Sequence, residues 1–103
     1  MKIYFTEYFK KQLKKLKKKF ANIKGDLLGA LEVLDLEKEI YIGRGIYKIR
    51  IRSSDVSSYV YLYRKKDLLV PLCIYHKSQK ESISDNELKY YFDMAIGELM
   101  NSQ

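Results

Sequence analysis

Gly45-Ile-Tyr-Lys-Ile-Arg-Ile-Arg52 is the stretch that decides the fold class, because its apolar and basic residues alternate strictly from Tyr47 onward. Successive side chains of a β-strand point to opposite faces of its sheet. The pattern therefore predicts a half-buried strand over residues 45–52. Its apolar face is formed by Tyr47, Ile49 and Ile51. Its cationic face carries Lys48, Arg50 and Arg52.

The residues that precede Asp35 follow a helical period instead. The first apolar stripe recurs at spacings of four, three and four, through Phe9, Leu13, Leu16 and Phe20. A second stripe is formed by Ile23, Leu27, Leu31 and Leu34. Thr6 is placed to accept a free backbone N–H at the start of the first helix. Residues 22–25 join the two stripes, so we expect an antiparallel helical hairpin.

The remaining segments predict three further strands and a last helix. The strands are expected over residues 2–5, 59–63 and 68–76, with a polar loop at 53–58 and a turn at 64–67. Pro71 cannot donate to a ladder, so it should mark a sheet edge or a bulge. Ser84 and Glu87 have the spacing of a capping box ahead of a C-terminal amphipathic helix.

These segments indicate one α+β domain over residues 1–103, in the order β-α-α-β-β-β-α. We expect a small antiparallel sheet, with an N-terminal helical hairpin and a C-terminal helix packed mainly on one of its faces. The single Cys73 lies in an apolar strand and is expected in the core. A reducing cytoplasm is the simplest location for such a chain.

Charge is the most informative total, since 20 Lys and Arg against 13 Asp and Glu leave a net +7. Residues 1–20 hold eight lysines and one acid, whereas the residues after Lys80 are mildly acidic. Such a polycation attracts phosphate backbones, anionic membrane or an acidic protein, and the charge alone does not choose among them. A membrane role for the helix at 9–20 is disfavoured, because the core needs its apolar stripe.

Several classes of chemistry are not indicated. The N-terminus has neither the long apolar run of a membrane span nor the pattern of a secretory signal. One cysteine and one histidine cannot form a Cys/His zinc site, and no glycine-rich phosphate loop follows a strand. We therefore expect no cofactor and no bound metal.

Three features are candidates for function. The first is the row of like charges at 48, 50 and 52, which repel one another unless an anion lies on that face. The second is His76 with Lys77 and Lys80: histidine exchanges protons near neutral pH, and lysine stabilises charge developing on phosphate. The third is the set of strand tyrosines, which either stack nucleobases or simply supply core area. These are Tyr59, Tyr61, Tyr63 and Tyr75.

Three stretches, in order along the chain, resemble RelE-like toxins of bacterial toxin–antitoxin pairs, in the branch that includes HigB. Residues 9–20, Phe-Lys-Lys-Gln-Leu-Lys-Lys-Leu-Lys-Lys-Lys-Phe, with Ile23 and Asp26-Leu27 after them, are similar to the opening helical hairpin of that family. Residues 45–51 resemble its first long strand. Residues 74–84, Ile-Tyr-His-Lys-Ser-Gln-Lys-Glu-Ser-Ile-Ser, resemble the segment leading into its last helix.

The resemblance implies a type II toxin that acts as an mRNA interferase at the ribosome, and a neighbouring antitoxin that neutralises its basic surface. By position, it implies that RNA is held by Lys48, Arg50, Arg52 and Tyr75. It implies a catalytic group of His76, Lys77, Arg50 and Lys80. Oligomeric state, codon preference and ribosome dependence stay open.

One departure from the family pattern favours a second interpretation. Where the family commonly has an arginine phosphate ligand, this chain has Val60. Losing such a donor costs a few kcal/mol of transition-state stabilisation. The alternative is therefore a catalytically degenerate or ParE-like member, which binds a topoisomerase or an antitoxin without cutting RNA. A basic nucleic-acid-binding module unrelated to toxins explains the lysines but not the ordered match.

Overall fold

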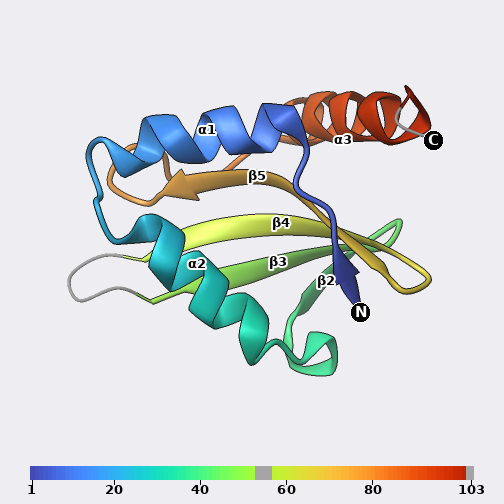
Figure 1. Ribbon diagram of the computed structural model, residues 1–103, viewed down its shortest axis with the longest axis horizontal. Coiled ribbons are helices and arrows are strands. Elements are labelled where there is room, and N and C mark those ends of the chain that lie inside the picture. Colours follow the sequence, from blue (N-terminus) through green and yellow to red (C-terminus); the bar gives the residue numbers. More distant parts are fainter. Residues whose placement is uncertain (53–56, 102–103) are drawn as a thin grey trace.

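The computed structural model describes residues 1–52 and 57–101, which form a five-stranded sheet and three α-helices (Figure 1). The helices are α1 (Glu7–Lys17), α2 (Ile23–Glu32) and α3 (Asp85–Asn101), with a short 3-10 turn at Leu36–Lys38. The strands are β1 (Lys2–Ile3), β2 (Ile40–Gly43), β3 (Ile46–Ile51), β4 (Ser58–Lys65) and β5 (Leu68–His76).

The predicted α+β class and the order of its elements are confirmed, with one strand added. That strand is β2, which pairs antiparallel with β3. The loop predicted at 53–58 falls mainly on residues 53–56, which lie outside the described residues, and Ser58 already belongs to β4.

The sheet has the strand order β1-β5-β4-β3-β2, antiparallel except for the β1–β5 pair. β1 pairs with only the first two residues of β5, so the rest of β5 is an outer strand. Leu62 pairs with Pro71 and Tyr61 with Cys73, which leaves Leu72 as an extra residue in β5. The bulge predicted from Pro71 is therefore confirmed.

The helices cover both faces of the sheet, so the prediction that they pack mainly on one face is wrong. α1 and α2 pack on the face that contains Ile49, Val60 and Ile74, and α2 lies across the strands in Figure 1. α3 packs through Ala95 on the opposite face. The physical reason lies in β5, whose nearly continuous apolar run has to be buried on both sides.

Both predicted helix starts are confirmed. The Thr6 hydroxyl accepts the N–H of Phe9 at 3.0 Å, and the buried position of Thr6 protects this bond. At α3, the N–H of Glu87 donates to the Ser84 hydroxyl at 3.2 Å, while the Glu87 carboxylate accepts the N–H of Ser84. These reciprocal bonds form the capping box.

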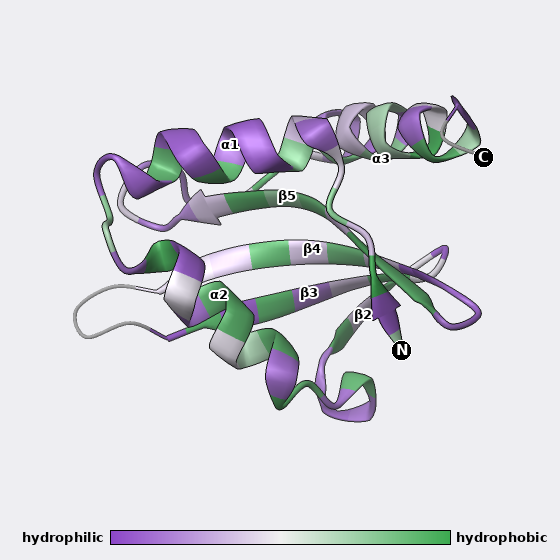
Figure 2. Cartoon of the chain, viewed as in Figure 1, coloured by the Kyte–Doolittle hydropathy of each residue, from purple (hydrophilic) through white to green (hydrophobic). Residues whose placement is uncertain are grey.

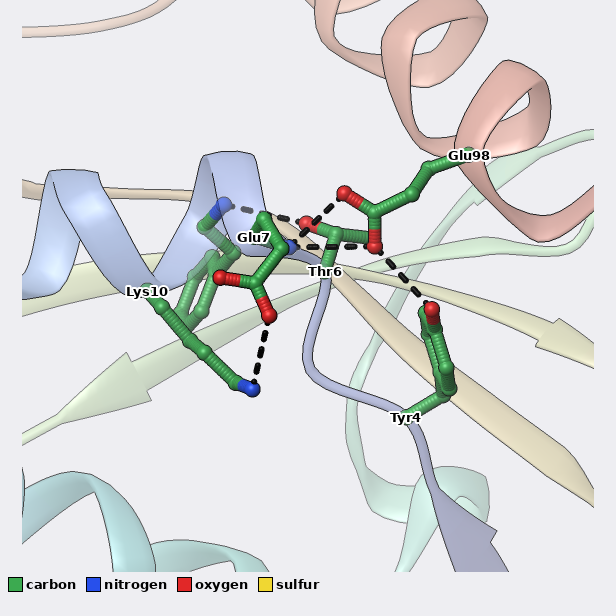
Figure 3. Close-up of polar contacts among 6 residues, drawn as sticks. Tyr4, Thr6, Glu7, Lys10 and Glu98 are labelled. Carbon is green, nitrogen blue, oxygen red and sulfur yellow. Dashed lines mark hydrogen bonds and ion pairs between the residues drawn. The ribbon is translucent and has the colours of Figure 1, made fainter. Parts of the chain in front are cut away.

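A contact that the sequence did not predict joins the first helix to the last (Figure 3). The Glu98 carboxylate of α3 accepts the N–H of Glu7 at 2.8 and 3.0 Å, and the Tyr4 hydroxyl donates to it at 3.1 Å. A negative charge is favoured at a helix N-terminus, where backbone N–H groups are free. Glu98 therefore holds α1 and α3 in a fixed relation across the edge of the sheet.

The surface of α1 is strongly hydrophilic, while β3 and β5 carry most of the apolar residues of the sheet (Figure 2). No helix in the described part of the chain is long and apolar enough to cross a membrane.

Candidate functional site

The face of the sheet opposite α1 and α2 carries three parallel rows of side chains, set by the strand register. The row nearest the β3–β4 connection is Arg50, Tyr59 and Tyr75. The next row is Lys48, Tyr61 and Cys73, and the last is Ile46, Tyr63 and Val70. The last row lies under α3, whose Phe92 ring meets that of Tyr63 edge-on at 5.0 Å. The β3 side of the first two rows is left accessible.

We call this accessible region the cationic patch, and define it as Lys48, Arg50, Arg52, Tyr59, Tyr61 and Tyr75. Arg50 and Arg52 are exposed, Lys48 and Tyr59 are half-buried, and Tyr61 and Tyr75 are buried. The predicted cationic face of β3 is confirmed for Lys48 and Arg50, whereas Arg52 lies just past the end of the strand. The tyrosines of β4 and β5 form the floor beside this face.

Lys48 and Arg50 are held in position by neutral groups. The Lys48 ammonium lies 4.7 Å from the centre of the Tyr59 ring and 5.8 Å from that of Tyr61. A cation over an aromatic face is stabilised by about 0.5–1 kcal/mol when it is partly exposed. The Arg50 Nε donates to the Ser57 hydroxyl at 2.7 Å, which orients the guanidinium.

The cations of the patch have no acidic partner among the described residues, whose ion pairs all lie elsewhere. Two like charges two residues apart on a strand repel each other, and no carboxylate of the described residues forms an ion pair with either of them. The patch therefore favours an anion, and the guanidinium plane of Arg50 matches the oxygens of a phosphate.

The tyrosine floor is stacked and stays protonated. The rings of Tyr59 and Tyr75 stack with centres 5.5 Å apart and an interplanar angle of 26°. Burial raises the pKa of Tyr61 and of Tyr75 above the ordinary 10.0. Both phenols are therefore neutral at physiological pH. The Tyr75 hydroxyl is buried and has no hydrogen-bond partner among the described residues.

His76 lies on the other side of the sheet from the patch. Its ring stacks on Phe20 with centres 3.8 Å apart, and only 4% of the residue is exposed. The N–H of Ser78 donates to its Nδ1 at 3.3 Å, and the Ser78 hydroxyl lies 2.6 Å from the same atom. Because that N–H can only donate, Nδ1 is an acceptor and Nε2 carries the proton. The structure does not bring His76 together with Arg50.

The two lysines predicted near His76 differ in their surroundings. Lys77 is exposed just beyond β5, and its N–H donates at 3.0 Å to the carbonyl of Ser57, the residue that binds Arg50. Lys77 thus lies at the margin of the patch. Lys80 is farther along and forms an ion pair with Glu87 of α3. That pair raises the pKa of Lys80 and lowers that of Glu87.

Val60, which stands where an arginine was expected, points away from the patch. It is 1% exposed and belongs to the core beneath α1 and α2. Its neighbours Tyr59 and Tyr61 are the residues of β4 that face Lys48 and Arg50. A cation at position 60 would not reach this site.

Two contributors were not predicted from the sequence. Ser57, which orients Arg50, has no motif of its own. Ile40 of β2 pairs with Lys48 and is 64% exposed, so it extends the patch with an apolar side chain. The position of Tyr59 and Tyr61 in the patch could be predicted from the sequence, because residues 59–63 alternate as residues 47–52 do on the neighbouring strand.

Within residues 1–52 and 57–101, no three His, Cys, Asp or Glu side chains are grouped so that they could hold a metal ion. No protein-family model matches this sequence, and no curated protein matches it. The resemblance to RelE-like toxins therefore stays a prediction, and the site is interpreted from its own geometry.

Proposed function

We propose that this chain is the toxin of a type II toxin–antitoxin pair, similar to RelE and HigB, and that the cationic patch binds single-stranded mRNA on the ribosome. The observation that carries the proposal is the row of Arg50, Tyr59 and Tyr75, with the Lys48 ammonium above the adjoining rings. It combines phosphate ligands with an aromatic surface, which is how proteins bind single-stranded RNA.

In the proposed complex, the Arg50 guanidinium and the Lys48 ammonium contact phosphate oxygens. The exposed part of Tyr59 stacks against a nucleobase, and Tyr75 supports Tyr59 from beneath. Stacking of one base on an aromatic side chain contributes about 1–3 kcal/mol, which is comparable to what each phosphate contact adds at low salt. Ile40 offers an apolar wall at the far side of Lys48.

The reaction we propose is cleavage of mRNA by its own ribose. The 2′-oxygen attacks the adjacent phosphorus, the bond to the 5′-oxygen breaks, and the products end in a 2′,3′-cyclic phosphate and a 5′-hydroxyl. The 2′-hydroxyl loses one proton and the 5′-oxygen gains one. Lys48 and Arg50 stabilise the negative charge that grows on the phosphate oxygens, which is the largest single contribution a preorganised site makes.

The makeup of the patch also supports a second candidate, a toxin that binds without cutting. The patch contains cations and neutral phenols, and neither an imidazole nor a carboxylate. We propose that water or a group of the ribosome accepts the proton of the 2′-hydroxyl. If neither serves, the chain is a binding protein of the same superfamily, and its target is a topoisomerase or the translation machinery.

The test is cleavage of a defined mRNA on translating ribosomes by the purified protein, with the new 5′ ends mapped by primer extension. The proposal predicts cuts at defined positions within codons. They should be lost in the double variant Lys48→Ala with Arg50→Ala. The matched control is Arg64→Ala with Lys65→Ala, which removes the same charges from exposed positions at the far end of β4.

Intact mRNA from a folded protein that still arrests growth would support the binding-only candidate. Equal loss of cleavage in both double variants would mean that net charge, and not the patch, determines activity. The proposal also requires a cytoplasmic protein and an acidic antitoxin encoded beside it. Co-expression of the neighbouring reading frame should then restore growth and yield a stable complex on purification.

A further inference from the structure

A second basic region lies next to the patch, in a groove between α1 and α3 along the outer edge of β5. The groove has a volume of about 460 Å³. Its walls include Lys15 of α1, Lys19 of the turn that follows α1, Gln79 and Lys80 of the segment after β5, and the rings of Tyr75 and Tyr91. We call it the edge groove. Neither the cationic face of β3 nor the resemblance of the chain to toxins predicted it.

The groove exists because α1 takes the place of a neighbouring strand. Beyond its first two residues β5 has no partner on this side, and the Gln12 side chain accepts the free N–H of Ile74 at 2.8 Å. This bond satisfies a backbone N–H group at the edge of β5 and holds α1 against that edge. Lys15 follows Gln12 by three residues, which places both on the same side of α1. Lys19 lies just past the end of the helix and lines the same groove.

The charge of the edge groove is carried by Lys15 and Lys19. Lys80 is neutralised by Glu87, whose carboxylate is in turn held by Ser84. Lys15 and Lys19 have no ion pair within the described residues. Both lysines line the groove, so an anion bound there is attracted by two positive charges.

The edge groove is continuous with the cationic patch through one residue. Tyr75 lines the groove and also stacks under Tyr59 in the patch. Lys15 and Lys19 line the same groove as Tyr75, so an RNA chain that extends from the patch past Tyr75 would meet them. Because neither lysine has an ion pair within the described residues, a polyanion that continues from the patch fits the groove better than an isolated ion.

We infer that the edge groove binds the sugar–phosphate backbone of the same single-stranded RNA, on one side of the nucleotides held at the cationic patch. This inference rests on the proposed function, since the patch supplies the first contacts. It gives the protein a longer RNA footprint than the patch alone, and it assigns Lys15 and Lys19 to phosphates of the substrate.

The experiment measures fluorescence anisotropy of labelled single-stranded RNA of two lengths, one short enough for the patch alone and one about eight nucleotides longer, across a range of salt concentrations. The wild-type protein should bind the longer RNA more tightly and with a steeper salt dependence. In Lys15→Ala with Lys19→Ala, the slope of log K against log salt for the longer RNA should fall by about 1.4, since each phosphate contact on a single strand contributes about 0.7. The short RNA should bind as it does to the wild-type protein.

The matched control is Lys14→Ala with Lys17→Ala. Lys14 and Lys17 belong to α1, and replacing them removes the same charge, but they line a different groove, between α1 and α2. The control should keep the wild-type slope for both RNAs. Circular dichroism checks that each variant is folded.

Each other outcome contradicts the inference in a distinct way. An equal fall of the salt slope in both double variants would show that the RNA is attracted to the α1 region as a whole and not to the edge groove. If the wild-type protein binds the longer RNA no more tightly than the short one, the RNA does not enter the edge groove, although the patch can still bind it. Failure of both RNAs to bind would overturn the proposed function as well. If the Lys15 and Lys19 variant binds RNA normally but loses its antitoxin, the groove belongs to the protein partner.

Discussion

Replacing Val60 with arginine restores the residue expected from the family pattern, and the structure predicts that this variant loses stability without gaining activity. Val60 is 1% exposed, pairs with Ile49 and Ile74, and faces the core under α1 and α2. Loss of the buried valine costs about 1.5–3 kcal/mol. An unpaired guanidinium in that core costs several kcal/mol more.

The two costs together lower the free energy of unfolding by about 4 kcal/mol or more, against a total of about 5–15 kcal/mol for a domain of this kind. Each kcal/mol corresponds to about 4–8 °C in a domain of 60–100 residues, so the melting temperature should fall by about 16 °C or more. Urea titration and thermal unfolding, both followed by circular dichroism, measure these changes.

The matched control is Tyr59→Arg, at the adjacent position on the opposite face. Because Tyr59 is half-buried beside solvent, this change should cost only about 1–2 kcal/mol, mainly through the lost stacking and cation contacts. A Val60→Arg protein within about 1 kcal/mol of the wild type, with increased RNA cleavage, would refute the assignment of position 60 to the core.

Three further predictions concern stability. Glu98→Gln should lower the free energy of unfolding by about 1–2 kcal/mol in urea titrations, because the charged acceptor at the α1 N-terminus is lost; unchanged stability would mean that water replaces this contact. Tyr75→Phe should leave stability unchanged or raise it by about 1 kcal/mol, because the buried hydroxyl has no partner among the described residues; a clear loss would reveal one. Burial raises the pKa of the Cys73 thiol from 9.0 to about 12, so the unfolded state loses its proton first and stability falls as pH rises from about 9 toward 12. Cys73→Ala should make that alkaline decrease shallower by up to about 1.4 kcal/mol per pH unit, and an unchanged slope would assign it to the tyrosines.

The elements that could be predicted are those whose signals are local. The alternation along residues 45–52 fixed both the strand and the face of each cation. The caps at Thr6 and Ser84 were correct because a cap depends on residues three apart. β2 was missed because Ile40, Tyr41 and Ile42 form a short apolar run without alternation.

The parts of the site that could not be predicted depend on contacts between distant segments. Nothing in the local sequence of Gln12 indicates that it binds the edge of β5, and nothing near Ser57 indicates that it orients Arg50. The separation of His76 from the patch, in contrast, could have been predicted from the sequence. Neighbouring residues in a strand face opposite sides, so His76 and Tyr75 cannot share one face of β5.

The central claim is that the accessible side of this sheet face binds RNA. It is tested most directly by NMR, with a short single-stranded RNA titrated into the ¹⁵N-labelled protein. The account predicts that the largest shifts occur at the Arg50 Nε and at the amides of Lys48, Ser57 and Tyr59, with none at Arg64. Shifts confined to the α1 and α2 surface, with these signals unmoved, would contradict it.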